Sequence, residues 1–241
     1  MCGIVGYVGN RNAQDTLLNG LRRLEYRGYD SAGILTLAQS GEATKLRSPG
    51  KVEELAKLIT SHHVNDTFGI GHTRWATHGA PTENNAHPHR YGDVFIVHNG
   101  IIENYKELKS RLQDAHFVTE TDTEVLAALI NELYQRKDVK LEDAVTQALK
   151  LVRGAYGVAV MSPKEPGKVV AARLGSPLLI GVGEDETFVA SDAAAVIAHT
   201  RQVIYMNDGE LAVCTPGNVE IRDLSSQPVS KKVETIEGDL Q

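Results

Sequence analysis

Cysteine, long apolar runs and basic clusters are scarce in this 241-residue sequence, and each scarcity excludes a class of protein. The two cysteines, Cys2 and Cys214, are too few for a disulfide framework. No stretch approaches the roughly 18 consecutive apolar residues of a membrane-spanning helix. Lysine and arginine total 25 against 31 aspartates and glutamates, which gives a net charge of −6 without a basic run. We therefore expect a protein of the reducing cytoplasm that binds neither membranes nor nucleic acid.

The common metal and phosphate motifs are also missing. Nine histidines are present, but neither His-Glu-x-x-His nor Cys-x-x-Cys occurs, and the closest pair, His87 and His89, lies in a loop-like segment. Gly3, Gly6 and Gly9 are spaced by three, but no strand precedes them, so they do not form a dinucleotide-binding fingerprint. We expect no metal and no organic cofactor.

Hydrophobic periodicity predicts mostly antiparallel sheets with helices against them, in one domain. Helices are predicted at 12–25, 52–59, 104–112, about 121–133 and 141–152, with Asn104 as the cap of the third. Short strands are predicted at 2–8, 34–37, 43–47, 68–73, 94–97, 154–161, 168–173, 178–182, 187–190, 203–205, 210–214 and 219–223. Residues 75–92 read as a long polar loop, and such loops are often functional. The polar residues 226–241 show no apolar period and are predicted to be a linker after a domain of residues 1–225.

Cys2 is the first candidate for catalysis because it follows the initiator methionine. Its small side chain permits removal of Met1, which would leave a thiol and a free α-amine on one residue. An α-amine has a pKa of roughly 7.7–8.0 and can take the thiol proton, whereas the amide nitrogen left by a retained Met1 cannot. The resulting thiolate attacks a carboxamide carbon and gives a thioester that water cleaves. Alternatively, Cys2 is a small apolar residue that opens a buried strand, and the residue alone favours that interpretation.

The segment after residue 72 offers groups that suit a small charged ligand. Arg74, at the end of a predicted strand, can hold a carboxylate through two hydrogen bonds. Trp75 can form a wall over a ligand, and Thr77 and His78 add polar contacts. The alternatives are a surface salt bridge for Arg74 and a core position for Trp75.

Two further positions carry groups for acyl transfer and for charge recognition. The Asn99 side chain and the Gly100 backbone N–H can together donate to a developing oxyanion, although the same dipeptide is typical of a tight turn. Asp122 can bind an ammonium group, although an acid at this position is also typical of the first turn of a helix.

Seven motifs occur in one order along the chain: Cys2 to Gly6, Leu21 to Gly33, Gly71 to Gly79, Asn85 to His89, His98 to Asn104, Thr121 to Glu124 and Arg153 to Gly157. In this order they closely resemble the glutaminase domains of the glucosamine-6-phosphate synthases, also called isomerising glutamine–fructose-6-phosphate aminotransferases. These domains belong to the N-terminal-nucleophile, class II glutamine amidotransferases. The resemblance extends over the chain to about residue 225.

The resemblance implies an α+β fold of four layers, an αββα sandwich with two antiparallel sheets between helix layers. It implies hydrolysis of L-glutamine to L-glutamate and ammonia through a thioester on Cys2, with the freed amine as general base. Asn99 and Gly100 match the oxyanion hole of the family. Arg74 matches the residue that binds the α-carboxylate of glutamine, and Asp122 the acid that binds its α-ammonium group.

The resemblance assigns supporting roles to five more residues. Trp75, Thr77 and His78 match a loop that closes over glutamine. Arg27 and Gly28 match a segment beside the nucleophile, where Arg27 helps to hold the amine.

The family also implies a covalently linked partner domain. In the full-length synthases a sugar isomerase domain binds fructose 6-phosphate and uses the ammonia to make glucosamine 6-phosphate. We expect residues 1–225 to be an excised glutaminase domain and 226–241 to lead towards that absent domain. The alternatives are the glutaminase domain of another class II enzyme, such as amidophosphoribosyltransferase or asparagine synthetase, and a non-catalytic glutamine-binding module. The segments 25–30 and 73–78 fit the glucosamine enzymes better than amidophosphoribosyltransferase. Asparagine synthetase shares the opening Cys-Gly-Ile but fits the later motifs less well.

Overall fold

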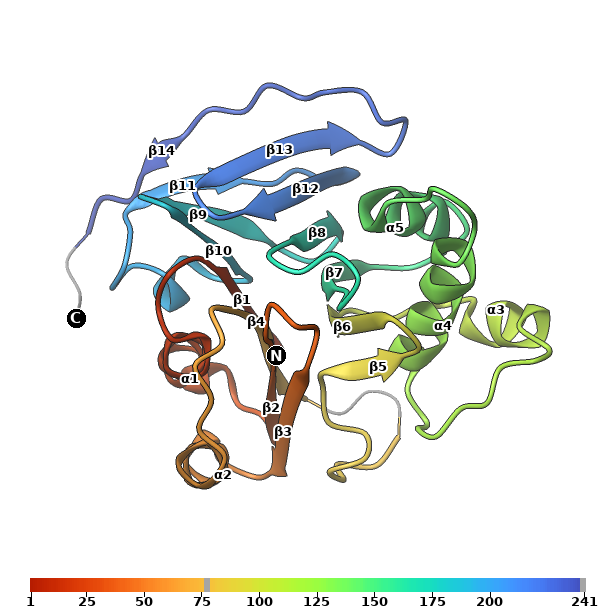
Figure 1. Ribbon diagram of the computed structural model, residues 1–241, viewed down its shortest axis with the longest axis horizontal. Helices are drawn as coiled ribbons and strands as arrows, with labels where there is room; N and C mark the ends of the chain where they lie inside the picture. Colours follow the sequence, from red (N-terminus) through yellow and green to blue (C-terminus); the bar gives the residue numbers. More distant parts are fainter. Residues whose placement is uncertain (76–78, 239–241) are drawn as a thin grey trace.

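Two antiparallel sheets form the centre of the computed structural model, which describes residues 1–75 and 79–238 (Figure 1). The 8-stranded sheet has the order β14 (Glu234–Thr235), β11 (Gln202–Tyr205), β9 (Leu179–Gly183), β10 (Glu186–Ala190), β1 (Gly3–Val8), β4 (Phe68–Arg74), β2 (Ser31–Leu37) and β3 (Ala43–Pro49). The 6-stranded sheet has the order β13 (Asn218–Asp223), β12 (Glu210–Thr215), β8 (Val169–Leu174), β7 (Tyr156–Met161), β6 (Val94–Asn99) and β5 (His89–Tyr91). The helices are α1 (Ala13–Arg23), α2 (Val52–Ser61), α3 (Tyr105–Arg111), α4 (Asp122–Tyr134) and α5 (Leu141–Leu149), with short 3₁₀ turns η1 (Glu25–Arg27) and η2 (Ala193–Ala195).

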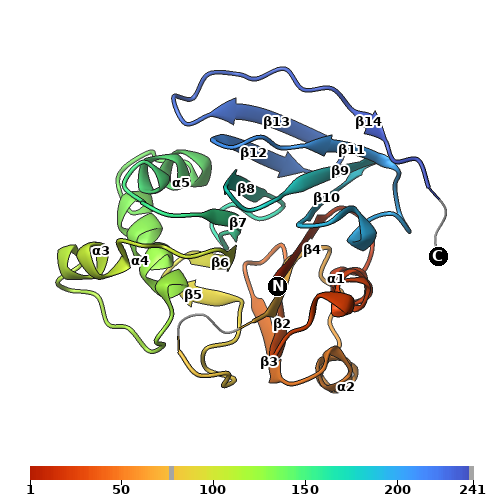
Figure 2. The same ribbon diagram turned by 180° about the vertical axis from the view of Figure 1, so that it is seen from behind.

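The helices cover the outer faces of the two sheets, so the molecule has the four layers αββα that the family resemblance implies. Figures 1 and 2 show α1 and α2 against the larger sheet and α3, α4 and α5 on the side of the smaller one. Three apolar clusters fill the spaces between these layers. One joins the two sheets through residues such as Ile4, Val97 and Ile180, and the other two lie under the helices. Strands buried on both faces explain why β1 and β6 are largely apolar.

Local capping fixes where two of these helices begin. The Asn12 side chain accepts a hydrogen bond from the Asp15 N–H at the start of α1. The Thr121 hydroxyl accepts from the Glu124 N–H at the start of α4, with a distance of 3.3 Å. Each such cap stabilises a helix by about 1 kcal/mol. The cap of α4 places Asp122 at the first position of the helix.

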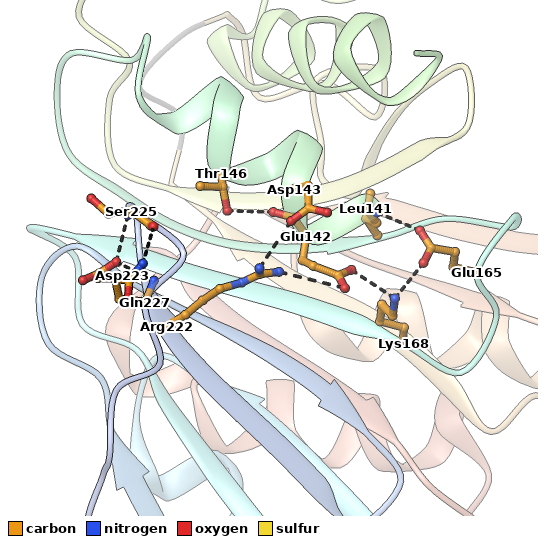
Figure 3. Close-up of polar contacts among 10 residues, drawn as sticks. All are labelled: Leu141, Glu142, Asp143, Thr146, Glu165, Lys168, Arg222, Asp223, Ser225 and Gln227. Atoms are coloured by element: carbon orange, nitrogen blue, oxygen red, sulfur yellow. Dashed lines mark hydrogen bonds and ion pairs between the residues drawn. The ribbon is translucent and has the colours of Figure 1, made fainter. Parts of the chain in front are cut away.

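A group of ion pairs fastens α5 to the smaller sheet (Figure 3). The ammonium group of Lys168 lies 3.0 Å from a carboxylate oxygen of Glu142 and 2.6 Å from one of Glu165. Arg222, in β13 of the smaller sheet, pairs with Asp143 at 3.3 Å and lies 3.9 Å from Glu142. Because α5 packs on α4, these contacts also hold the helix that carries Asp122.

Two local predictions are wrong. His89–Tyr91 form strand β5 inside the segment predicted as a loop, since three residues are too few to show a period and the strand depends on pairing with β6. Asn104 precedes α3, but its side chain does not cap the helix. Its amide instead donates to Leu151 O and accepts from Arg153 N, which ties α3 to the chain after α5.

Past residue 225 the chain contacts both sheets. Val229 N–H donates to Ile221 O in β13 of the smaller sheet at 2.8 Å, and Glu234–Thr235 pair with β11 of the larger sheet as β14. No helix among the described residues combines the length and the apolar character that crossing a membrane requires.

Candidate active site

A cavity of about 530 Å³ lies where the start of β1 meets the ends of β4 and β6. Seven of the residues predicted from the sequence line it: Cys2, Arg27, Arg74, Trp75, Asn99, Gly100 and Asp122. Gly28 follows Arg27 at the end of η1, in the left-handed region with φ 71°, and faces Trp75 without lining the cavity. The predicted contacts Thr77 and His78 lie outside the described residues.

Strand pairing places the Cys2 thiol against the end of β4. Gly3 pairs with Thr73, so the residue before β1 lies beside the residues that follow Thr73. The Trp75 N–H donates to Cys2 Sγ at 3.0 Å. Burial raises the pKa of the Cys2 thiol, and the Trp75 N–H and the positive charges nearby only partly offset this effect. The thiol is therefore protonated at neutral pH, and its use as a nucleophile requires a base at the same place.

Arg27 holds the backbone beside the thiol, and Asp192 orients Arg27. Arg27 donates from Nη1 to Cys2 O at 3.4 Å, and its Nη2 pairs with an Asp192 carboxylate oxygen at 2.9 Å. The Tyr26 hydroxyl donates to the same carboxylate oxygen. Burial raises the pKa of Asp192, but hydrogen bonds and the charge of Arg27 outweigh burial and leave the pKa below its ordinary value. The prediction from sequence missed Asp192, since no local motif links it to a residue so far away in the chain.

Two opposite charges are buried on the cavity wall. Arg74 is 3% exposed, and its Nη1 donates to Ala80 O at 3.2 Å. Burial lowers the pKa of Arg74. Asp122 is 4% exposed and accepts a hydrogen bond from Ile102 N–H at 2.9 Å. Because Thr121 is the residue that caps α4, the helix start alone does not account for the Asp122 carboxylate in this cavity.

The end of β6 supplies hydrogen-bond donors beside the thiol. Asn99 Nδ2 donates to Cys2 O at 3.1 Å. Gly100, the next residue, has φ 109°, and a Cβ there would lie 2.3 Å from Ala155 O. Only glycine therefore fits this turn, and Gly100 lines the cavity.

Several lining residues were not predicted as site residues, and they come from distant parts of the chain. His87 and Ser191 both line the cavity, and Ser191 Oγ accepts from the Ile4 N–H at 2.9 Å. His87 stacks on the fully buried His72, with ring centroids 4.1 Å apart. In the described part of the chain, no group of three or more histidine, cysteine or acidic side chains is arranged to hold a metal ion.

The chain is similar to known proteins over most of its length. Residues 59–215 match a family described as a glutamine amidotransferase domain. The chain is 47% identical to an isomerising glutamine–fructose-6-phosphate aminotransferase of Chlorobaculum tepidum and 51% identical to one of Thermus thermophilus. Each alignment covers the whole chain and 40% of the relative, so the chain spans about 40% of the length of these curated relatives.

Solved structures show the same fold. A glutamine phosphoribosylpyrophosphate amidotransferase from B. subtilis superposes with a TM-score of 0.78 at 27% identity, over 94% of this chain and 50% of that one. A glutamine aminotransferase class-II domain protein from Silicibacter pomeroyi superposes with a TM-score of 0.62 at 16% identity, over 92% of this chain and 99% of that one, which shows the fold alone. The family match covers more than half of the sequence and includes the strands that carry Arg74 and Asn99. The chain belongs to the glutamine amidotransferase domain family.

Proposed function

We propose that this chain hydrolyses L-glutamine to L-glutamate and ammonia through a thioester on Cys2. The observation that carries the proposal is one cavity that holds a thiol, a buried cation and a buried anion, namely Cys2, Arg74 and Asp122. Glutamine is a zwitterion, so a selective site needs one charge of each sign at a fixed separation. Arg74 binds the α-carboxylate and Asp122 the α-ammonium group. Fixing both ends of the amino acid leaves its side-chain amide over the thiol, and this positioning is a large part of the rate gain.

The reaction then needs only groups of this chain and water. With Met1 removed, the α-amine of Cys2 takes the thiol proton, and Sγ attacks the amide carbon. The oxyanion accepts hydrogen bonds from Asn99 Nδ2 and Gly100 N–H. The α-ammonium group returns the proton to the leaving nitrogen, which departs as ammonia. Water, activated by the same amine, cleaves the thioester and releases glutamate. One oxyanion donor is worth about 2.7–4 kcal/mol.

The segment after β4 covers the bound substrate. Trp75 lines the cavity and keeps 55% of its surface exposed, as expected of a wall that has solvent on one side. From the family resemblance we assign Thr77 and His78 as further contacts for glutamine, although both lie outside the described residues. Arg27 and Gly28 support the nucleophile, Arg27 through its bond to Cys2 O.

We further infer that the ammonia serves a longer enzyme of the hexosamine pathway, an isomerising glutamine–fructose-6-phosphate aminotransferase of the cytoplasm. Two relatives with that name are 47% and 51% identical to the whole chain, which covers 40% of each of them. The amidophosphoribosyltransferase alternative has less support, since the phosphoribosylpyrophosphate enzyme is 27% identical. In this proposal residues 1–225 are the glutaminase domain, and 226–241 lead to a sugar isomerase domain that binds fructose 6-phosphate.

Mass spectrometry and a glutaminase assay test the proposal together. We expect the active chain to lack Met1 and to gain one adduct, on Cys2, from the glutamine-like electrophile 6-diazo-5-oxonorleucine. Cys214 is the internal control, because it is fully buried and burial raises its pKa to about 12. The Cys2→Ala chain should bind glutamine without releasing glutamate. Turnover by that variant, or an adduct elsewhere, would refute the assignment.

The charge clamp has its own assay. Asp122→Asn removes the anion for the substrate ammonium group while keeping an oxygen for the Ile102 N–H. We expect the glutamine KM to rise at least tenfold, since a hydrogen bond to a charged group contributes about 1.5–3 kcal/mol. An unchanged KM would contradict the role of Asp122.

A further inference from the structure

One buried histidine makes two hydrogen bonds from the same ring nitrogen. Nε2 of His72, in β4, lies 3.1 Å from His98 O and 2.8 Å from Asn99 Oδ1. A backbone carbonyl oxygen is only an acceptor, so Nε2 has to carry the hydrogen. The same N–H therefore points at Asn99 and can bond only its amide oxygen.

The His72 ring is uncharged, so only one of its two nitrogens carries hydrogen. His72 is 0% exposed, and burial lowers its pKa to about 3, against weaker opposing effects from its hydrogen bonds. A neutral ring with hydrogen on Nε2 has none on Nδ1. His72 Nδ1 indeed has no partner in the part of the chain that the structure describes, and the face of the ring is covered by His87.

The other end of the Asn99 amide is fixed as well. Asn99 Nδ2 donates to Cys2 O at 3.1 Å, and that carbonyl is again only an acceptor. Turning the amide over would place its NH₂ against the His72 N–H and its oxygen against Cys2 O, so both hydrogen bonds would be lost. His72 and Cys2 O therefore permit one orientation of the amide.

We propose that His72 is a positioning residue, whose Nε2–H holds the Asn99 amide so that its NH₂ is directed to the site of the oxyanion beside Cys2. This inference rests on the proposed function and deepens it, since it gives the reason why Asn99 presents donors to the cavity. His72 itself does not line the cavity and touches no substrate.

Kinetics of two substitutions separate positioning from packing. His72→Leu removes the donor, and we expect kcat for glutamine hydrolysis to fall about 10- to 100-fold with KM within twofold, since loss of a whole oxyanion donor costs about 10²–10³ in kcat. His72→Gln keeps an N–H donor of similar reach and should recover most of kcat. His89→Leu is the matched control, because His89 is buried in the same histidine cluster and its Nε2 has no hydrogen-bond partner among the described residues. Its kcat should stay within twofold of the unsubstituted chain.

Alkylation of Cys2 by iodoacetamide separates failure of this inference from failure of the proposed function. That reaction forms no oxyanion, so its rate should be equal in the unsubstituted and His72→Leu chains. An unsubstituted chain without glutaminase activity, or activity that survives Cys2→Ala, would overturn the proposed function and this inference with it. A Cys2-dependent glutaminase whose kcat is unchanged in His72→Leu, or equally lowered in His89→Leu, would overturn the role of His72 alone.

The unsubstituted chain gives a second test that does not depend on folding of a variant. Nitrogen-15 NMR of the His72 ring should show hydrogen on Nε2 and none on Nδ1, unchanged between pH 5 and pH 8. Hydrogen on Nδ1 alone, or a charged ring in this range, would overturn the proposal.

Discussion

Adding one methyl group at Gly100 should disable the site without touching the thiol. The residue has φ 109°, a region that side chains rarely adopt, and holding alanine there costs about 1–3 kcal/mol. A Cβ would also lie 2.3 Å from Ala155 O and 2.8 Å from Ala155 C, both backbone atoms that cannot rotate away. Cβ atoms essentially never approach another heavy atom closer than 3.0 Å, so the turn has to move by about 0.7 Å or more.

Such a movement displaces the Gly100 N–H from the oxyanion. A misplacement of about 1 Å costs on the order of 10²-fold in rate. We therefore expect Gly100→Ala to lower kcat for glutamine about 100-fold. Strain of this size should also lower Tm by about 2–12 °C, since a chain of this length loses roughly 2–4 °C for each kcal/mol.

A matched glycine separates the two effects. Gly167 has φ 79°, and a Cβ there would have no described atom within 4 Å, so alanine meets backbone strain without a collision. Gly167→Ala should lower Tm by a few degrees and leave kcat unchanged. Steady-state kinetics and thermal unfolding of the three chains decide the matter. A kcat for Gly100→Ala within threefold of the unsubstituted chain would refute the steric argument and the oxyanion role of this turn.

Two further substitutions test the supports of the site and of the fold. Asp192→Asn weakens the 2.9 Å ion pair of Arg27 and should lower kcat about tenfold with little change in KM. Because the folded pKa of Asp192 is depressed, its stabilising effect is present above about pH 4 and is lost as the pH falls through the folded pKa. The Tm difference between the two chains should therefore vanish in acid, and a difference that persists at pH 2 would contradict this. Lys168→Met removes the cation shared by the largely buried carboxylates of Glu142 and Glu165, and leaves Glu142 only the longer 3.9 Å pair with Arg222 (Figure 3). Urea unfolding should show a loss of about 2 kcal/mol with kcat unchanged, and a loss under about 0.5 kcal/mol would contradict it.

The sequence allows the pieces of the site to be predicted because each piece stands at the end of an element. Arg74 ends one strand, Asn99 ends another with Gly100 directly after it, and Asp122 begins a helix. Local rules on strand ends, turns and helix starts mark such positions. The same rules leave the structural alternative open at each one, and only the order of the motifs along the chain favours a shared site.

Contacts between segments that are far apart in the sequence could not be predicted. The bonds from His72 to Asn99 and from Arg27 to Asp192 join residues on different elements, and no periodicity encodes them. Strand β5 was not predicted for the same reason, because this short strand depends on its pairing with β6. The Asn104 side chain makes its hydrogen bonds to residues far away in the sequence, in the chain after α5. It therefore does not cap the start of α3.

Strand β1 lies inside its sheet, between β4 and β10, so its pairing is completed only late in synthesis of the chain. Val5 pairs with Ala190, so β1 cannot pair with β10 until Ala190 has been synthesised. At about 5–20 residues per second, roughly 10–40 s separate the appearance of Cys2 from that of Ala190. During this interval β1 lacks its pairing with β10, and afterwards Ile4 and Val5 are buried. Met1, whose removal the proposed mechanism requires, is 75% exposed in the folded chain, so its removal does not have to fall within that interval. Folding therefore encloses β1 and leaves the residue to be removed at the surface of the molecule.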